Sequence, residues 1–499
     1  MDIDNETNPV VGFDLGTTFS AIARWVDRKG PQIIQNRAGQ DTTQSAVYYN
    51  PENDEIIVGN TAYNRGLMSP ENMIVGVKRL MDDGNQEITL GGKTFTPISL
   101  SSLILEKIYE DAKMKYPAGT FSSRGSVVTV PCYFKVHQMD NTRKAAEMAD
   151  INCVGILQEP IAASLTYALQ ICEDHFDKEF EQKILVFDLG GGTFDLTLFQ
   201  LKHTNDTIYF EVLASSGDDR LGGMDFDRCL ADVILEKSGV SLDGVEEKLF
   251  NKAQKNLLEQ SILAKIALSA SNDYYVAVPF ILPDQHIEVS VTRDEFEQCI
   301  KHYLDKIAVI VDGIWSSSNL RASDIDRVIR VGGSSLIPCV KNLLDDILGA
   351  EKTWSNINPS TSIAEGAAMY AAYLDNTDFF EKKIDIRTRT CHALGVKTAG
   401  NRFKELIPAN REAPCSAKQV FTTTQDNIEK LELTVYQGSG RKISKKTHSR
   451  IGKIPINNIS PKLAGEIDIV VNFSIDMAQR LAITVEVDGQ KESAVLDYA

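Results

Sequence analysis

One short pattern occurs twice in this chain and limits what it can fold into. Residues 11–21 read VGFDLGTTFSA, and residues 186–196 read VFDLGGGTFDL. In both copies an apolar run, typical of a buried strand, ends in Asp-Leu and opens into glycine and threonine. Such a turn lets backbone N–H groups approach an anion closely, because no side chain stands in the way. The repeat predicts two related α/β lobes, each with a phosphate-binding turn.

The residues of these turns suit a polyphosphate and its metal ion. Asp14 and Asp188 end their strands, and their carboxylates suit Mg²⁺, which takes few protein ligands and keeps most of its waters. Thr17, Thr18 and Thr193 add hydroxyl donors. We therefore expect the two turns to face each other across a cleft that holds a nucleotide.

A third glycine turn strengthens this interpretation. Residues 331–335 read VGGSS, follow the apolar run RVIR and precede a predicted helix. One glycine-rich turn after a strand is more often only a turn. Three such turns predict several sets of backbone donors around one nucleotide.

The order of the predicted elements divides the chain into two parts. Residues 9–375 alternate strand and helix patterns, as α/β proteins do. From residue 391 onward, short runs of strict alternation indicate a half-buried antiparallel β unit, as at 431–436, 467–473 and 481–487. Between them, residues 376–390 are charged and lack a helical period, which predicts a linker. Helices are predicted at 99–116, 137–150, 159–172, 256–271, 292–315 and 362–374.

Composition excludes several classes of partner. The net charge of −17 argues against an extended nucleic-acid-binding surface. No apolar run reaches membrane-spanning length, and the acidic N-terminus is not a targeting signal. The eight cysteines form no C-x-x-C pair, which favours buried free thiols in a reducing compartment. We expect a cytoplasmic protein with neither nucleic acid nor membrane as a partner.

The motifs together resemble those of a known family. DLGTTFS, VPCYF, QEPIAASLTY, FDLGGGTFDL, LGGMDFD and VGGSSLIP, in this order, are similar to the 70-kilodalton heat-shock-protein (DnaK-type) chaperones. HALGV, QVFTTTQDNIEKLELTVYQG and IDIVVNFSID resemble that family's peptide-binding domain. The resemblance implies an α/β, actin-like ATPase fold over 9–375, with two duplicated lobes around a nucleotide cleft. A smaller antiparallel β-sandwich would follow at 391–499.

The resemblance also implies roles for the residues that match the family's motifs. Lys78 would neutralise the γ-phosphate and place the attacking water, while Glu159 and Asp195 would orient or polarise that water. Asp14 and Asp188 would hold Mg²⁺ through water, with K⁺ as a further ion. The catalytic set is Lys78, Glu159, Asp188, Thr193 and Asp195. The residues that would bind ATP or ADP are Asp14, Gly16, Thr17, Thr18, Phe19, Gly190, Gly191, Gly192, Gly222, Gly223, Lys265, Ser269, Gly332, Gly333, Ser334 and Leu336.

Plainer interpretations exist for some of these residues. Lys78 could be a solvated surface lysine, and Glu159 a carboxylate favoured by a helix N-terminus. In the β unit, the residues that match the family's peptide groove could equally be core, because alternating leucine in a strand usually is. Those groove residues are Thr398, Ala399, Phe421, Leu431 and Leu433.

The adenosine end departs from the family pattern. Ile262 and Ile266 stand where the family has glutamate and arginine, and Leu336 stands where it has a second arginine. Met224 and Ser360 replace two further acidic residues of the family motifs. Two guanidinium planes over a purine contribute about 0.5–2 kcal/mol each. We therefore expect ATP to bind more weakly, with poorer selection of the base.

The elements that couple the two parts also differ. The linker residues 384–390 are less apolar and more basic than the family's. Gly155, Gln158 and Ile161 occupy places where the family contacts J-domain cochaperones, and Met139 replaces an arginine that follows Pro131. Only residues 490–499 follow the last predicted strand, which is too short for a helical lid. We expect a weakened signature for J-domain and nucleotide-exchange cochaperones, and fast exchange of bound peptide.

Three functions are compatible with these features. The first is an ATP-hydrolysing chaperone that binds unfolded or extended apolar peptide segments in its β unit. The second is a non-cycling nucleotide-binding scaffold or nucleotide-exchange partner of a true chaperone. The third and weaker hypothesis is a sugar or metabolite kinase.

Overall fold

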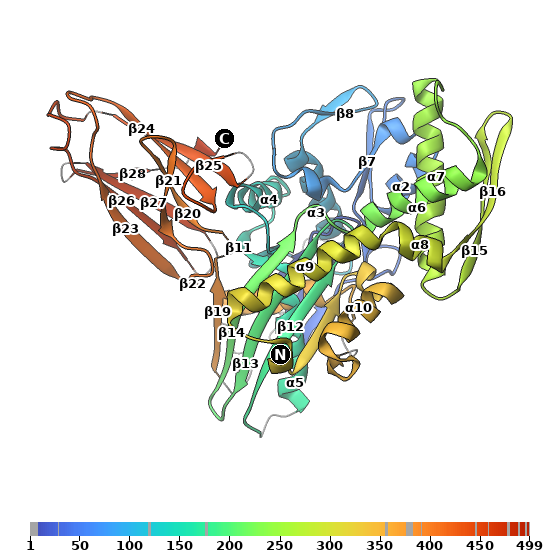
Figure 1. Cartoon of the computed structure of the whole chain (residues 1–499), viewed down its shortest axis with the longest axis horizontal. Helices are drawn as coiled ribbons and strands as arrows, with labels where there is room; N and C mark the ends of the chain where they lie inside the picture. The colour runs from blue at the N-terminus through green and yellow to red at the C-terminus, as the bar shows by residue number, and fades with distance from the viewer. Residues whose placement is uncertain are drawn as a thin grey trace.

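The structure is a computed structural model of the chain. It describes residues 8–27, 29–117, 121–174, 178–354, 358–375, 383–390, 392–444, 447–457, 459–476, 480–487, 490–494 and 497–498. An α/β part carries a β-sandwich on one side, with β19 and β22 between the two (Figure 1). Within the described ranges, no helix is both long and apolar enough to cross a membrane.

The two main sheets of the α/β part have the same topology. In each, a hairpin (β1–β2 or β12–β13) gains a third antiparallel strand on one side and two parallel strands on the other. The duplication predicted from the two turns is therefore confirmed by the strand order. The first sheet runs β11 (Cys153–Gln158), β10 (Gly125–Val130), β1 (Val10–Asp14), β2 (Phe19–Val26) and β3 (Gly30–Ile33), and β4 (Thr43–Gln44) pairs with β2. The second runs β18 (Thr353–Trp354), β17 (Arg327–Val331), β12 (Phe180–Leu189), β13 (Phe194–His203), β14 (Thr207–Asp218), β19 (Lys383–Arg389) and β22 (Glu412–Ala413).

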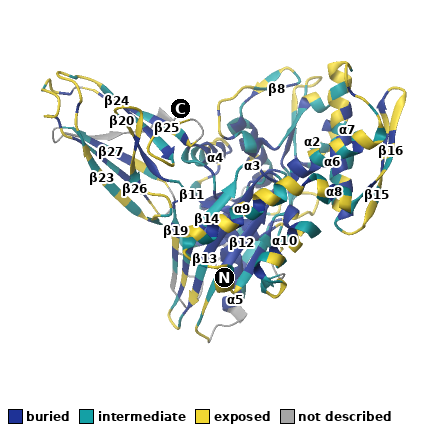
Figure 2. Ribbon diagram, in the orientation of Figure 1, coloured by how far each residue is buried: buried dark blue, intermediate teal, exposed yellow. Residues whose placement is uncertain are grey.

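The central strands are apolar on both faces because the sheets lie inside the α/β part. β10 is buried along its whole length, and Figure 2 shows β12 and β13 largely in the colour of buried residues. Helices α5 (Glu159–Asp174) and α11 (Ser362–Leu374) pack on each other, in a core that contains residues of both sheets. Their approach needs glycine, since a Cβ atom on Gly366 would lie 1.8 Å from the Ala162 carbonyl oxygen. Small residues thus join the two lobes beneath the cleft.

The six predicted helical segments are helical in the structure, but two of the predictions had wrong boundaries. The helix predicted at 256–271 begins nine residues earlier, as α7 (Glu247–Leu268). The segment 292–315 was predicted as a single helix and forms two, α8 (Arg293–Cys299) and α9 (Lys301–Ser318). The break falls at Ile300, which is fully buried. The apolar period therefore continues across the break and hides it from the sequence. The other helices are α2 (Asn60–Gly66), α3 (Pro97–Lys113), α4 (Val136–Met148), α6 (Gly223–Ser238) and α10 (Pro338–Leu348).

Short elements complete the α/β part. Three small sheets consist of β6 (Glu55–Val58), β5 (Ala46–Asn50) and β7 (Met73–Val75), of β8 (Ile88–Leu90) and β9 (Lys93–Phe95), and of β15 (Asp273–Leu282) and β16 (Gln285–Thr292). The 3₁₀ turns are η1 (Pro70–Asn72), η2 (Val77–Leu80), η3 (Ala322–Asp324), η4 (Gly333–Leu336) and η5 (Ala350–Lys352).

The β unit is a sandwich of two antiparallel sheets. Along β26 buried and half-buried residues alternate without exception, so one face of the strand enters the core. One sheet runs β21 (Arg402–Ile407), β20 (Leu394–Thr398), β24 (Leu431–Gly438), β25 (His448–Ile456) and β29 (Asp497–Tyr498). The other runs β23 (Cys415–Phe421), β26 (Ile469–Ile475), β27 (Leu481–Val487) and β28 (Gln490–Ala494).

The second half of the predicted linker is a strand rather than a free segment. Residues 376–382 lie outside the described residues, but β19 pairs in parallel with β14 and antiparallel with β22. The basic residues that set this linker apart have acidic partners: Arg389 pairs with Glu211 at 2.7 Å, and Arg387 with Glu412 at 3.6 Å. The linker thus extends the second ATPase-like sheet toward the β-sandwich.

The cysteines agree in part with the sequence prediction. Cys132 and Cys172 are buried thiols, whereas Cys153, Cys229, Cys299, Cys339 and Cys415 are thiols that are only half-buried. Cys391 lies outside the described residues.

Candidate active site

The two glycine turns abut each other at the centre of the cleft. A Cβ atom on Gly191 would lie 2.2 Å from Oγ1 of Thr18, and one on Gly192 would lie 2.6 Å from Cγ2 of Thr17. A side chain at either glycine would therefore clash with the facing turn. The second turn is closed by the Gly190 N–H, which donates to the Thr193 carbonyl over 3.1 Å. Glycine at these positions is what lets the turns lie this close.

A cluster of buried charges lies beside the turns. Asp14 ends β1, Asp188 and Asp195 are direct cross-strand partners on β12 and β13, and Glu159 begins α5. Lys78, in η2, is only 5% exposed and pairs with Glu159. The interpretation of Lys78 as a solvated surface lysine is therefore wrong. Glu159 does begin a helix, but it also faces a buried cation.

Burial and mutual repulsion raise the pKa values of these carboxylates. Burial, then the charge of Glu159, raises the pKa of Asp14 to about 7. The same causes raise the pKa of Asp195 to about 7 and the pKa of Asp188 well above its usual value. Lys78 opposes the rise at all three. Deprotonation of these carboxyl groups is therefore unfavourable, and a further cation beside them would stabilise their charged forms.

The carboxylates fit a hydrated magnesium ion. Oδ2 of Asp188 and Oδ2 of Asp195 are buried without a hydrogen-bond partner, so each has capacity for a water or a cation. Among the described residues, no group of three or more His, Cys, Asp or Glu side chains forms a direct metal cage. Two carboxylates that would bind Mg²⁺ mainly through water do not need such a cage, because Mg²⁺ usually keeps several of its waters. Asp14 and Asp188 are the residues that could hold the ion.

Two adjoining cavities bring most of the predicted residues together. A cavity of about 350 Å³ is lined by Asp14, Gly16, Thr17, Thr18, Phe19, Lys78, Glu159, Asp188, Gly190, Gly191, Thr193, Gly332 and Gly333, among others. A second cavity, of about 270 Å³, shares Thr17, Thr18, Phe19, Gly191 and Gly333 and adds Lys265, Ser269 and Ser334. The first has the larger polar share of lining surface and includes the four charged residues Asp14, Lys78, Glu159 and Asp188, whereas the second is largely apolar. Phosphate and nucleoside ends would differ in the same way. The predicted residues that line neither cavity are Gly192, Asp195, Gly222, Gly223 and Leu336.

Those five residues lie around the cavities rather than in their walls. Asp195 is fully buried and accepts a 2.7 Å hydrogen bond from the Cys132 N–H. The Gly223 N–H donates to the Gly190 carbonyl over 3.0 Å, so the turn of Gly222 and Gly223 supports the second glycine turn. Leu336 is 53% exposed, and its neighbour Ile337 lines the apolar cavity instead.

The apolar cavity has the altered residues predicted for the adenosine end. Ile262, Ile266 and Met224 line it. Its charged groups are engaged within the protein: Lys265 pairs with Asp227 at 2.6 Å, and Lys255 pairs with Glu259 at 3.4 Å. The Ser269 hydroxyl donates to the Lys265 carbonyl over 3.1 Å. The cavity thus offers shape and apolar surface more than hydrogen bonds to a base.

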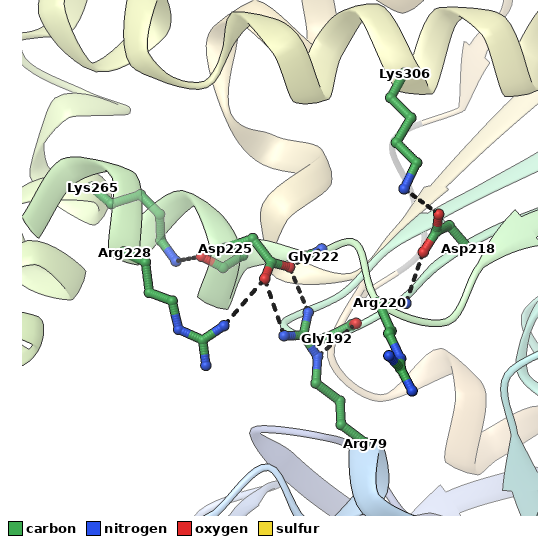
Figure 3. A network of polar contacts seen from close by, with 10 residues as sticks. Arg79, Gly192, Asp218, Arg220, Gly222, Asp225, Arg228, Lys265 and Lys306 are labelled. Atoms are coloured by element: carbon green, nitrogen blue, oxygen red, sulfur yellow. Dashed lines mark hydrogen bonds and ion pairs between the residues drawn. The ribbon is translucent and has the colours of Figure 1, made fainter. Parts of the chain in front are cut away.

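Sequence reasoning missed an arginine that spans the two lobes. Arg79, next to Lys78, reaches from the first lobe to the second (Figure 3). Its guanidinium binds both oxygens of Asp225, at 3.2 and 2.6 Å, and its Nε donates to the Gly192 carbonyl over 2.9 Å. Asp225 stands in the motif LGGMDFD, which the sequence analysis recognised, but only the fold shows that Arg79 is its partner.

A second contact crosses the cleft near the apolar cavity. The Tyr63 hydroxyl donates to Glu259 of α7, and the Lys255 ammonium lies 5.0 Å from the centre of the Tyr63 ring. Tyr63 is in α2 of the first lobe and lines the apolar cavity. Nothing in the sequence around Tyr63 pointed to this contact.

The predicted peptide-groove residues occupy mixed environments. Leu433 is buried in the sandwich core, and Phe421 and Leu431 are half-buried against that core. Thr398 is half-buried and donates to the Arg402 carbonyl over 3.3 Å, and Ala399 is exposed. The core interpretation therefore describes Leu433, while the other four remain accessible in part.

Comparison with known proteins agrees with this geometry. A family model described as Hsp70 protein matches residues 10–86 and 81–495. A chaperone protein dnaK from Emiliania huxleyi is 34% identical over 503 aligned residues, which cover 96% of this chain and 77% of that protein. The match agrees with four features of the structure: the duplicated lobes, the facing glycine turns, the buried lysine–carboxylate cluster and the β-sandwich that follows. The chain therefore belongs to the Hsp70 family, whose members are chaperone-type ATPases.

Proposed function

We propose that this chain binds and hydrolyses ATP in its cleft and binds extended apolar peptide segments in its β-sandwich. The observation that carries the ATPase proposal is the buried Lys78–Glu159 pair, which lies in one cavity with Asp14, Asp188 and Thr193. We assign the ATPase domain to residues 9–375, the linker to 376–390 and the peptide-binding domain to 391–499.

In this proposal, different residues of the cleft bind the phosphates, neutralise their charge and orient the attacking water. The N–H groups and hydroxyls of the two turns bind phosphate oxygens, and the Lys78 ammonium neutralises the terminal phosphate. Glu159 and Asp195 accept hydrogen bonds from the attacking water and orient it. Asp14 and Asp188 would hold Mg²⁺ through water, and the ion would supply further positive charge at the phosphates. The resemblance to the family implies that K⁺ would be a further ion of the ATPase.

Single-turnover hydrolysis of ATP by the Lys78→Ala variant tests the ATPase assignment. Loss of one preorganised charge should lower the rate by about 10²–10³-fold. Lys93→Ala is a matched control, because Lys93 pairs with Asp54 on the surface at 2.8 Å and lies outside both cavities. An unchanged rate in Lys78→Ala would show that Lys78 does not contribute to hydrolysis.

A second function has support from the nucleoside end. A non-cycling nucleotide-binding scaffold or exchange partner needs nucleotide binding but little turnover. The engaged Lys265, Lys255 and Ser269 leave the apolar cavity few groups with which to select adenine. ATP turnover measured with and without an extended apolar peptide separates the two functions. Turnover that responds to peptide supports the chaperone, and binding without turnover supports the scaffold.

The family's cochaperones are proposed partners with a weakened signature. Gln158 and Ile161, at the places of the J-domain contact, are buried, and Gln158 faces the β-sandwich across a small cavity. We therefore expect a J-domain to stimulate turnover only weakly, and we expect the protein in the cytoplasm.

A further inference from the structure

A surface groove continues the apolar cavity away from the glycine turns. The groove has a volume of about 560 Å³ and lies between η1 of the first lobe and helices α6 and α7 of the second. It shares Arg228, Lys255 and Leu258 with the apolar cavity. The apolar cavity in turn shares residues of all three glycine turns with the polar cavity. The three spaces therefore form a series, with the apolar cavity in the middle.

The order of the three spaces decides which edge of a bound base would face the groove. Among the residues that the structure describes, none lines both the polar cavity and the groove. A nucleotide with its phosphates at the glycine turns would place its base in the apolar cavity, and the edge of the base farthest from the ribose would point toward the groove. In adenine that edge belongs to the six-membered ring, which carries the exocyclic amine N⁶. A group attached to N⁶ would therefore enter the groove.

The floor of the groove is apolar. Leu257 and Leu242 are buried, and Leu235 and Leu258 are half-buried. Two acidic side chains, Glu71 and Asp232, also line the groove. Their charge disfavours a second phosphate-bearing group, whereas the leucines suit an aromatic or alkyl group.

Arg228 is placed to cover an aromatic ring in the groove. Its side chain is 60% exposed, and its ion pair with Asp225 spans 3.4 Å, whereas Arg79 binds the same carboxylate at 2.6 Å (Figure 3). A guanidinium plane stacks well on an aromatic face. Lys255, the other cation shared with the apolar cavity, is already engaged by Glu259 and by the ring of Tyr63.

We propose that the groove is a subsite for an apolar group carried on the base, so that the cleft binds N⁶-substituted adenine nucleotides more tightly than unsubstituted ones. Leu235 and Leu258 contact the added group, and the Arg228 guanidinium covers it. The inference rests on the proposed binding of nucleotide in the cleft. It gives a positive role to an adenosine end that offers apolar surface rather than hydrogen bonds to the base.

Calorimetric titration of the full chain with ADP and with N⁶-benzyl-ADP, both with Mg²⁺, tests the proposal. The diphosphates are used because they avoid turnover during the measurement. The Kd of N⁶-benzyl-ADP should be about 10-fold lower than that of ADP, the gain expected from partial burial of one ring and from stacking of one guanidinium on it.

Two variants and one further nucleotide locate the benzyl group. Leu235→Gln puts an amide in the floor of the groove and should reduce the 10-fold ratio of the two Kd values to about 2–3-fold. Leu249→Gln is the matched control, because Leu249 is a 37% exposed residue of α7 that lines none of the three spaces, and it should keep the ratio. ADP with an anthraniloyl group on its ribose carries a ring at the other side of the nucleoside. Its affinity relative to ADP should be the same in Leu235→Gln as in the wild type.

Each outcome of these titrations decides the proposal. Wild-type binding of N⁶-benzyl-ADP that is no tighter than that of ADP would overturn the subsite and leave nucleotide binding intact. A ratio that Leu235→Gln does not change, or that Leu249→Gln lowers equally, would show that the benzyl group lies outside the groove. If neither nucleotide binds, the subsite and the proposed nucleotide binding are both refuted. Binding of N⁶-benzyl-ADP that weakens only in Leu235→Gln would support the subsite.

Discussion

Removal of Lys78 should destabilise the fold through the carboxylates left behind. The Lys78 ammonium is buried against Glu159, and it lowers the pKa values of Asp14, Asp188 and Asp195. Methionine has a similar length but no charge, so Lys78→Met leaves these carboxylates without their neighbouring cation. Breaking one side of a buried ion pair costs about 3–5 kcal/mol. We expect a loss of that order in the free energy of unfolding at pH 8.

The loss should shrink at lower pH. A carboxyl group with a folded pKa above its unfolded value binds more protons when folded, so its destabilising effect grows as pH rises through that interval. For Asp14 the interval runs from 3.8 to about 7. Below this interval the groups are protonated in both states and need no cation. At pH 6 we therefore expect Lys78→Met to cost clearly less than at pH 8.

Urea unfolding of the α/β part, followed at both pH values, measures this effect. The double variant Lys78→Met/Glu159→Gln should regain much of the stability at pH 8, because it removes a charge that Lys78 balanced. Lys93→Met serves as the control and should leave stability almost unchanged, since its partner Asp54 is at the surface. A loss that is equal at both pH values, or a double variant no better than the single one, would refute the electrostatic explanation.

Three further changes test other parts of the structure. Gly191→Ala should weaken ATP binding more than tenfold, because its Cβ would lie 2.2 Å from Oγ1 of Thr18, and Thr18→Ala in the same chain should recover part of the affinity measured by calorimetry. Ile266→Arg should strengthen ATP binding about 2–10-fold through stacking on the base, whereas an unchanged Kd would show that the base does not lie beside this helix. Arg389→Ala should make β19 more accessible to limited proteolysis, because the change breaks the 2.7 Å pair with Glu211. A rate of cleavage within residues 383–390 like that of the wild type would show that strand pairing alone holds β19.

Local patterns were sufficient to predict much of the fold. The strands at the glycine turns are continuous apolar runs, and buried strands of this kind are recognised without knowledge of their partners. The alternation at 431–436 and 481–487 likewise predicted strands that the structure contains, as β24 and β27. The break at Ile300 was missed because the apolar period passes through it unchanged.

The candidate site likewise contains some residues that a local pattern predicts and others that it does not. Asp14, Asp188 and the glycines were found because a strand followed by a glycine turn is a local signature of anion binding. Lys78 was found through resemblance to a family motif, since a single lysine in VGVKRL has no local feature that marks it as buried. Arg79 and Tyr63 were missed, because their partners Asp225 and Glu259 are distant in the sequence.

The sequence by itself determined the two glycine turns, the duplicated lobes they predict and the β unit that follows, because each is encoded by spacing within a few residues. Only the tertiary structure decided that Lys78 is buried beside four carboxylates, that Arg79 joins the lobes, and that the basic linker pairs with β14. These features depend on which distant segments meet, and that depends on the packing of the whole core rather than on any local pattern.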